Sequence, residues 1–473
     1  MKNAFIFIFI IEKWFRLVLS SEIISLELQY YYDQTLPNSS YSIFEILDKT
    51  YVYTYLKVGD PEYNIKTFIS MEYSYFSMSS KYEPIDAKDL SQIYNINKSN
   101  TFQNISLLDK YYIKSINDIA AKEKFKINSM AIKDLDFIYE SNNANMENSS
   151  LIEINYMNIG LQILLNDKFK YNFISLLKER KIIDNYNWFI LFDQLPKKSK
   201  GEMYNLDEIM NNKPKLLIGI LPHVYNPKKY NEKQFVQLYS NNFQWVIYFK
   251  YIYYFSKNNT NNNANSQKRS LYGNRVEIDF NTLLIYSPSL YYTYIKRDFF
   301  NEYLSLNICH LYEDNSIEGI FCEKSKNFGI ENLKLFPTLY FEYIELNYTF
   351  EFSYQDLFLE KDNKFLFLIA VDINSEIDEW YIGFSFLKKY QFVFNQDSKT
   401  IGFYNPDLEI ETNSNSKSSS SKYILYIIIF ISWIIFIFIG FFIGKYFYKK
   451  YKTKKRANEL DDNYEYLSGN NIN

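Results

Sequence analysis

Short runs of β-branched and aromatic residues recur along the chain from Tyr41 to Leu408, separated by polar residues, glycine or proline. Examples are "YVYTYLKV" from residue 51, "KLLIGIL" from residue 215 and "FLFLIAV" from residue 365. Runs of about four to eight such residues, bounded by turn-forming residues, are typical of β-strands. The pattern therefore predicts an all-β protein with many strands.

Helical patterns are few in this part of the chain. The best candidates are "DLSQIY" from residue 89 and "SPSLYYTYIKRDFFNEYL" from residue 287, which opens with a Ser-Pro helix start. Two segments have low complexity. Residues 257–269 are rich in asparagine and predict a loop, whereas residues 411–422 are rich in serine and asparagine and predict a flexible stalk.

One apolar segment, Tyr423 to Gly444, has 22 residues and no charge. A helix of that length spans a bilayer core of about 30 Å. The next twelve residues, "KYFYKKYKTKKR", include seven basic ones, which places the C-terminal tail in the cytosol by the positive-inside rule. A buried core helix is the alternative. We therefore expect a single-pass type I membrane protein of the secretory pathway, in the plasma membrane or an endosomal or lysosomal compartment.

The N-terminus opens with Lys2 and an apolar run from Ala4 to Ile11, which Glu12 and Lys13 interrupt. We predict a signal peptide over residues 1–21. An uncleaved signal or a short membrane-associated helix is the alternative, and both leave the residues up to about 422 in the lumen or outside the cell.

The composition narrows the function classes. The chain contains 47 tyrosines and 41 phenylalanines. A biased genomic base composition explains this enrichment as well as selection does, so we base no functional argument on it. The net charge is -3 and the body of the chain has no long basic face, so nucleic-acid binding is not expected. No cofactor or metal ion is expected either.

Two cysteines, Cys309 and Cys322, are the only ones in the chain. In a luminal domain such a pair predicts one disulfide, with two free buried thiols as the alternative. N-glycosylation sequons, which are compatible with secretion, begin at Asn38, Asn97, Asn104, Asn148, Asn258 and Asn347.

The segment "WYIGFSFLKKYQFVFNQDSKTIGFYN", from Trp380 to Asn405, strongly resembles the final strands of the pepsin-like aspartic proteases. Ten positions match the family pattern in unbroken register: Trp380, Gly383, Phe386, Leu387, Tyr390, Val393, Phe394, Ile401, Gly402 and Phe403. Further matches follow in family order: "YVYTYLKVGDPEYNIKTFI", "YNINKSNTFQNIS", "WFILFDQLPKKSKGEM" and "CHLYEDNSIEGIFCEK", the last resembling the family's disulfide loop.

This resemblance covers nearly all of Tyr41 to Leu408 and implies two β lobes related by an approximate two-fold axis, with a cleft between them. The expected organisation is a signal peptide (1–21), an N-terminal β lobe with a short leader (22–213), a C-terminal β lobe (214–410), the stalk (411–422), the transmembrane helix (423–444) and the cytosolic tail (445–473).

The family carries one catalytic aspartate in each lobe, and the two share one proton. In the second lobe, "RVEIDFNTLLIYSP" resembles the family motif and places Asp279 on the catalytic aspartate. The resemblance implies that Thr282 retains a hydroxyl that steadies this aspartate, whereas Phe280 and Asn281 depart from the motif. A solvated aspartate at a strand end is the alternative.

In the first lobe, "VGDPEYNIKTFISMEYSYFSM" aligns without a gap and places Ser70 where the family has its other aspartate. Serine does not ionise near neutral pH, so no shared-proton pair forms and water lacks its general base. Glu72 is displaced along the strand by about 6–7 Å from Ser70, so we do not expect its carboxylate to replace the missing aspartate. In the family's flap, Tyr111 or Tyr112 would take the place of the flap tyrosine.

Three hypotheses of function follow. The first is a pepsin-like membrane protein that is catalytically impaired or inactive and binds extended peptides in its cleft. The second is an active aspartic endopeptidase with an atypical site that uses Asp279. The third is a sorting or surface receptor that acts through its tail, where "YEYL", Tyr464 to Leu467, fits a tyrosine-based sorting pattern for an adaptor.

Overall fold

The computed structural model describes most of the chain between Ile23 and Leu408 and one helical segment beyond it. The described residues are 23–31, 43–48, 50–71, 74–84, 94, 98–107, 119–140, 151–163, 171–195, 198–199, 202–240, 244–256, 267–271, 275–313, 316–374, 379–408 and 440–454. Contacts divide the chain into a unit that ends at Leu408 and a second unit that begins at Glu409.

Several predicted features lie outside the described residues. They are the signal peptide, the helix expected from residue 89 apart from Tyr94, the stalk (411–422), residues 423–439 of the membrane span, and the side chains of Glu72, Tyr111, Tyr112, Tyr464 and Leu467, among others. Residues 440–454 form a helix. No helix in the described part of the chain has the length and apolar composition that crossing a membrane requires.

The first unit is mostly β, as the strand pattern predicts. One eight-stranded sheet uses chain segments up to Gly160. Its strands are β2 (Gln29–Tyr31), β3 (Tyr51–Val58), β4 (Tyr63–Ser70), β5 (Phe76–Pro84), β6 (Gln103–Leu107), β7 (Ile119–Ile127), β8 (Met130–Glu140) and β9 (Leu151–Gly160). Their order is β2-β3-β4-β9-β5-β8-β7-β6, and β3 also pairs with β7, so the sheet curls back on itself.

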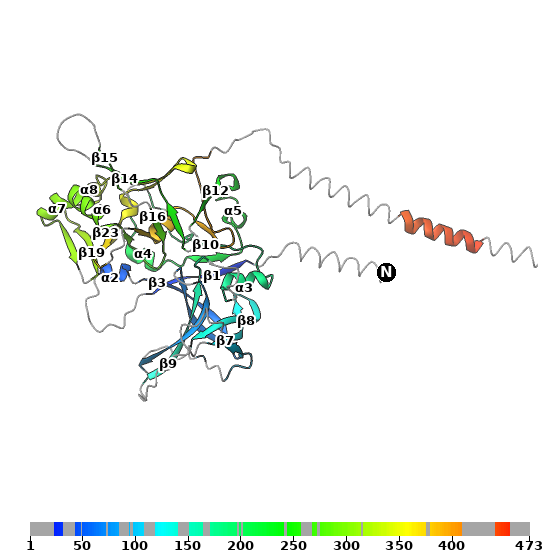
Figure 1. Cartoon of the computed structure of the whole chain (residues 1–473). Coiled ribbons are helices and arrows are strands. Elements are labelled where there is room, and N and C mark those ends of the chain that lie inside the picture. The colour runs from blue at the N-terminus through cyan, green and yellow to red at the C-terminus, as the bar shows by residue number, and fades with distance from the viewer. Residues whose placement is uncertain are drawn as a thin grey trace, which may run out of the picture. The chain divides into compact units, whose positions relative to one another are not determined.

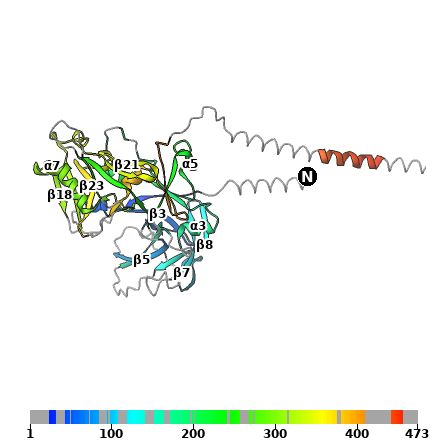
Figure 2. The same ribbon diagram turned by 45° about the horizontal axis from the view of Figure 1, so that its top comes forward.

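A second eight-stranded sheet uses segments after Trp245. Its strands are β13 (Val246–Tyr248), β16 (Arg275–Ile278), β17 (Ile285–Tyr286), β18 (Cys309–Glu313), β19 (Ile317–Glu323), β22 (Phe358–Lys361), β23 (Lys364–Asp372) and β24 (Trp380–Ile382). The order is β13-β16-β24-β17-β23-β19-β18, with β22 paired to β23. In both views, the labelled strands of the first eight-stranded sheet lie in a block below those of the second (Figures 1 and 2).

A six-stranded sheet takes strands from both parts of the chain. It contains β1 (Ile24–Glu27), β11 (Lys215–Ile218), β10 (Asn187–Leu191), β25 (Val393–Asn395), β26 (Thr400–Tyr404) and β12 (Phe235–Tyr239), in that order. A four-stranded sheet has the order β15 (Gln267–Leu271), β14 (Tyr251–Ser256), β20 (Leu339–Tyr343) and β21 (Tyr348–Phe352).

Helices in the first unit are short. They are α2 (Ile43–Asp48), α3 (Phe173–Glu179), α4 (Leu206–Met210), α5 (Pro222–Tyr225), α6 (Ser289–Ile295), α7 (Asn301–Ser305), α8 (Ile330–Leu333), α9 (Tyr354–Leu357) and α10 (Phe384–Lys389). Two 3-10 turns, η3 (Glu232–Gln234) and η5 (Ile344–Leu346), and one π-helical turn, η4 (Lys296–Phe300), add to them. The helix predicted from residue 287 is confirmed as α6, η4 and α7. Helix α3, "FISLLKE", is not among the predicted helices.

The two eight-stranded sheets contain the same four-strand arrangement. In the first, β4 runs parallel to β9, β9 antiparallel to β5, and β5 parallel to β8. In the second, β16 runs parallel to β24, β24 antiparallel to β17, and β17 parallel to β23. In each set the chain visits the strands in the same order, so the fold contains an internal structural repeat.

The core joins these sheets. A single cluster of buried apolar side chains extends from Ile24 in β1 to Phe403 in β26 and includes Trp188, Trp245 and Phe394. The rings of Trp188 and Phe394 stack at 4.2 Å between centroids, and the Trp188 and Trp245 rings meet edge to face at 6.0 Å. The six-stranded sheet therefore packs as part of the same hydrophobic core as the strands on either side of it.

Candidate functional site

The internal repeat gives Ser70 and Asp279 the same place in the fold. Ile69 pairs with Ile159 across β4 and β9, and Ile278 pairs with Ile382 across β16 and β24. Ser70 follows the first pair and Asp279 follows the second. All four isoleucines are buried.

The loop after each of these residues has the same length. Phe76 pairs with Ile159 and Ile285 pairs with Ile382, so six positions separate Ser70 from Phe76 and six separate Asp279 from Ile285. The equivalence of Ser70 and Asp279 therefore follows from strand pairing alone, without reference to any other protein.

Ser70 is the last residue of β4, and its register partner in the parallel strand β9 is Gly160. Its side chain is buried, with 8% exposed, and its backbone carbonyl accepts the Leu161 N–H at 2.8 Å. The loop after it is anchored by Asn172, the N-cap of α3, whose amide donates to the Ser74 carbonyl at 2.8 Å. The position is thus well packed, but its side chain is a hydroxyl.

Asp279 is half-buried at the start of the second loop. Its carboxylate accepts the Asn281 backbone N–H at 2.9 Å, and its own N–H donates to the Ile382 carbonyl at 3.2 Å. Gly383, the residue after β24, lies so close that a Cβ there would be 2.1 Å from the Asp279 carbonyl oxygen. Glycine at this position is therefore required for the backbone to pass the aspartate.

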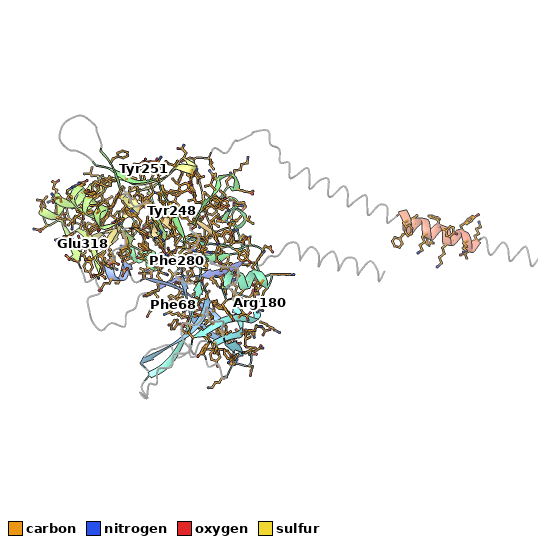
Figure 3. The ribbon with its side chains drawn as sticks, in the orientation of Figure 1. Phe68, Arg180, Tyr248, Tyr251, Phe280 and Glu318 are labelled. Carbon is orange, nitrogen blue, oxygen red and sulfur yellow. A yellow bond between two sulfur atoms is a disulfide. The ribbon has the colours of Figure 1, made fainter. Side chains whose placement is uncertain are left out.

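The residues that follow Ser70 and Asp279 are apolar. Met71 and Phe280 are each 3% exposed and belong to the main core cluster. The Phe280 ring contacts the Trp188 ring edge to face at 6.4 Å, and Phe280 is labelled near the middle of the first unit in Figure 3. Because neither side chain carries a hydroxyl, the two loops meet the core through apolar packing.

The Thr282 hydroxyl bonds to helix α2 and not to the Asp279 carboxylate. Its hydroxyl donates to the Leu47 carbonyl at 3.3 Å and accepts the Leu284 N–H at 3.0 Å. The Leu283 N–H also donates to the Leu47 carbonyl, at 2.9 Å. Helix α2 therefore packs directly on the loop that carries Asp279.

A cavity of about 470 Å³ opens beside Asp279. Carboxylates from four segments line it: Asp48, Asp279, Asp372 and Glu379. Tyr286, also in its wall, donates its hydroxyl to Asp48. The burial of Tyr286, and next the charge of Asp48, raise the pKa of its phenol well above the usual value, so it remains a neutral donor.

Tyr381 lines the same cavity. Its burial, and next the charge of Glu277, raise the pKa of its phenol. No group of histidine, cysteine and acidic residues in the described part of the chain is arranged to hold a metal ion. The cavity therefore offers carboxylates and phenols, and Asp279 is the carboxylate whose place in the internal repeat corresponds to that of Ser70.

The predicted disulfide is confirmed. Cys309 in β18 and Cys322 in β19 are bonded and face each other as a register pair of the two antiparallel strands. Tyr111, Tyr112 and Glu72 lie outside the described residues, so their relation to Ser70 and Asp279 stays a prediction.

Sequence reasoning missed several residues around Asp279. Gly160 has the same relation to Ser70 as Gly383 has to Asp279, and the shared "IG" in "MNIGL" and "YIGFS" was a signal for it. Asp48 and Asp372 carried no motif, because helix α2 and strand β23 bring them to the cavity from distant parts of the chain.

Neither a scan against models of known protein families nor a search of curated proteins finds a match to this chain. The interpretation of the site therefore depends on the chain's own residues and their geometry.

Proposed function

We propose that this chain is a membrane-anchored protein with the pepsin-like bilobal fold, whose cleft binds extended peptides and which lacks aspartic endopeptidase activity. The observation that carries the proposal is the internal repeat. It pairs Ser70 with Asp279 by strand register and loop length, as two aspartates would be paired in an active member of that family.

The chemistry of the pair supports the loss of activity. The family's mechanism needs one ionised carboxylate as general base for water and one protonated carboxyl group as donor to the substrate carbonyl. Asp279 supplies a single carboxylate, and the Ser70 hydroxyl does not ionise near neutral pH. General-base catalysis contributes about 10²–10⁴-fold to such reactions, and the electrostatic contribution of the second carboxylate is lost as well.

The sheet architecture supports the bilobal interpretation. Each eight-stranded sheet carries one copy of the repeat, and the six-stranded sheet takes β1 and β10 from the chain up to residue 213 and β11, β12, β25 and β26 from the chain after it. A cleft between two such parts suits an extended peptide, which would bind through main-chain hydrogen bonds and alternate side-chain pockets.

One observation favours the competing hypothesis of an active enzyme with an atypical site. Asp48, Asp372 and Glu379 share the cavity with Asp279, so carboxylates other than the one missing at residue 70 are available there. They come from α2, β23 and the segment before β24, and none occupies the position equivalent to Asp279 in the repeat.

A cleavage assay separates the two hypotheses. The full chain, purified in detergent, is incubated with a mixed peptide library from about pH 3 to 7, the range in which a carboxylate pair works. We expect no cleavage above that of the Asp279→Ala variant. Turnover that the wild-type chain shows and Asp279→Ala lacks would contradict the proposal and establish the atypical enzyme.

A further inference from the structure

The cavity beside Asp279 is strongly acidic. The described residues that line it include the carboxylates of Asp48, Asp279, Asp372 and Glu379, and no lysine, arginine or histidine. Arg275 is the neighbouring cation. It forms ion pairs with Glu379 and, at 3.3 Å, with Glu277, so its charge is already shared between two carboxylates. A negative potential in a walled cavity attracts a cationic ligand.

Asp372 is the carboxylate that β23 contributes to the cavity wall. Its Oδ1 accepts the Asn374 backbone N–H at 2.9 Å, and no lysine or arginine of the described chain pairs with it. Its position at the end of β23 places it in the cavity wall next to Val371. It is therefore a carboxylate with remaining capacity to accept hydrogen bonds.

A second and independent observation is a pair of buried polar atoms without partners. Ser287 lines the cavity, is only 4% exposed, and its hydroxyl has no hydrogen-bond partner. The amide oxygen of Asn281, in the same wall, is also buried without a donor. An unpaired buried polar atom is costly, because it has lost its water without gaining a partner. The Asn281 oxygen accepts hydrogen bonds and the Ser287 hydroxyl can accept or donate, so both retain capacity for a partner.

Tyrosine rings complete the wall. Tyr51, Tyr286 and Tyr381 line the cavity together with the carboxylates. The faces of aromatic rings attract organic cations, and Tyr51 also contacts Phe68 of β4 edge to face at 6.1 Å. The aromatic wall therefore continues from the cavity onto β4, the strand that ends at Ser70.

These features distinguish between kinds of cation. No metal-binding group is present among the described residues, so the carboxylates are not arranged around a bare metal ion. The volume of about 470 Å³ falls in the usual range of organic ligand sites. Carboxylates, unpaired acceptors and aromatic faces together match a flexible chain that ends in a guanidinium or ammonium group.

We propose that the cavity beside Asp279 receives the basic side chain of an arginine or lysine in a peptide bound along the cleft. This inference rests on the proposed function, and it adds the substrate class: the chain selects extended peptides by a basic residue. Asp372, Ser287 and Asn281 are the residues that recognise the cationic group.

The test measures binding to the full chain in detergent with three probes. Agmatine alone reports on the cavity. A fluorescent extended peptide with one arginine reports on the cavity and the cleft together. The same peptide with citrulline in place of arginine keeps the shape and removes the charge. We expect the arginine peptide to bind about tenfold more tightly than the citrulline peptide, the difference that one charge-assisted contact makes.

Variants locate the effect. Asp372→Asn is expected to weaken binding of agmatine and of the arginine peptide by roughly tenfold and to leave the citrulline peptide unchanged. Ser287→Ala is expected to weaken both cationic probes by a smaller factor. Asp362→Asn is the matched control. Its side chain is 72% exposed in the turn between β22 and β23, at the end of β23 away from Asp372, and its removal is expected to have no effect.

The outcomes separate the inference from the function on which it rests. Equal binding of the arginine and citrulline peptides, with no binding of agmatine, would overturn the inference and leave peptide binding intact. Binding of agmatine that depends on Asp372, with no binding of either peptide, would support the cationic cavity and contradict a peptide-binding cleft. Loss of cationic binding in Asp362→Asn to the same degree as in Asp372→Asn would also overturn the inference.

Discussion

Gly383 shows how the absence of one side chain permits the backbone geometry beside Asp279. A Cβ at this residue would lie 2.1 Å from the Asp279 carbonyl oxygen and 2.6 Å from that of Thr282, and both are backbone atoms that cannot rotate away. The space that a Cβ would need is therefore a sufficient reason for glycine at this residue.

We therefore predict that Gly383→Ala destabilises the fold by about 2–3 kcal/mol through overpacking. Denaturation by urea, followed by tryptophan fluorescence, measures the change. Gly329→Ala is the control, because a Cβ at residue 329 meets no atom within 4 Å. Equal stability of the two variants would show that the backbone around Asp279 relaxes freely.

Lys388 is a second residue whose surroundings change its chemistry. Its Nζ lies 3.8 Å from the centroid of the Tyr204 ring, at the end of α10. Burial lowers the pKa of its ammonium to about 8, and the nearby charge of Asp356 only partly opposes this. The unfolded chain keeps the ordinary pKa of 10.5. It therefore binds more protons than the folded chain between about pH 8 and 10.5, and stability rises with pH in that window.

Replacing this lysine should remove that dependence. We predict that Lys388→Met raises the free energy of unfolding at pH 7 by at most about 3 kcal/mol. Loss of the cation–π contact with Tyr204 reduces this gain, and the gain becomes smaller as the pH approaches 10. Site-resolved acetylation in the wild-type chain should show a midpoint near pH 8 for Lys388. For Lys334, whose pKa is raised by its bond to Glu331, it should be much higher. A common midpoint would contradict the prediction.

At the scale of elements, Glu123 ties strand β7 to the segment around Ser99. Its carboxylate is fully buried and accepts the hydroxyls of Tyr94, Thr101 and, at 2.8 Å, Ser99. It also accepts the Lys124 N–H at 2.8 Å. A buried carboxylate is tolerated only when its oxygens are satisfied, and here three hydroxyls from neighbouring segments do so.

Glu123→Gln is expected to destabilise the first eight-stranded sheet by about 2–3 kcal/mol, because the new amide hydrogens face hydroxyl donors. Hydrogen exchange of β6 and β7, read by mass spectrometry, would locate the loss. Glu331→Gln, at a side chain that is 83% exposed, serves as the control. Unchanged exchange in β6 and β7 would show that the hydroxyls can reorganise without the carboxylate.

Strand existence was well predicted from the sequence, and strand ends were not. The run "KLLIGIL" indicated a strand, but β11 ends at Ile218 because Gly219 has a φ of +84° and turns the chain. The run "WVIYFKYIYYF", from Trp245 to Phe255, is continuous in the sequence, but β13 and β14 within it belong to different sheets. The pairing partner decides where a strand stops, and local patterns do not contain it.

At the scale of the whole molecule, the six-stranded sheet unites the chain up to Leu408. Strand β10 pairs with β25, although Asn187 and its register partner Asn395 are 208 residues apart in the sequence. The Asn395 side-chain amide donates a hydrogen bond to the Asn187 amide oxygen at 2.8 Å. We predict one cooperative unfolding transition for this unit, with equal calorimetric and van't Hoff enthalpies. Two separate transitions, one shifted by Glu123→Gln and the other by Gly383→Ala, would show that the sheet does not couple the two parts.

Glycosylation tests the proposed luminal location. Asn104 and Asn347 each begin a sequon and are exposed on the first unit. Expression in a eukaryotic host should give a chain that an endoglycosidase shortens on a gel, and Asn104→Gln should remove one glycan from it. Asn158→Gln, which changes an asparagine outside any sequon, is the control. A wild-type chain that carries no glycan would contradict the luminal location.

Residue types and their spacing predict the strand-rich character and the pairing of Cys309 with Cys322, because each depends on a continuous stretch of chain. The correspondence of Ser70 with Asp279 entered as an implication of the resemblance, and the strand pairing of the two repeats supports it. The surroundings of Asp279, in contrast, follow from the folded arrangement of distant segments. Asp48, Asp372 and Glu379 reach the cavity because α2, β23 and the segment before β24 converge there. The electrostatic potential in the cavity is a sum over charges on residues that are far apart in the chain, so no local sequence pattern predicts it.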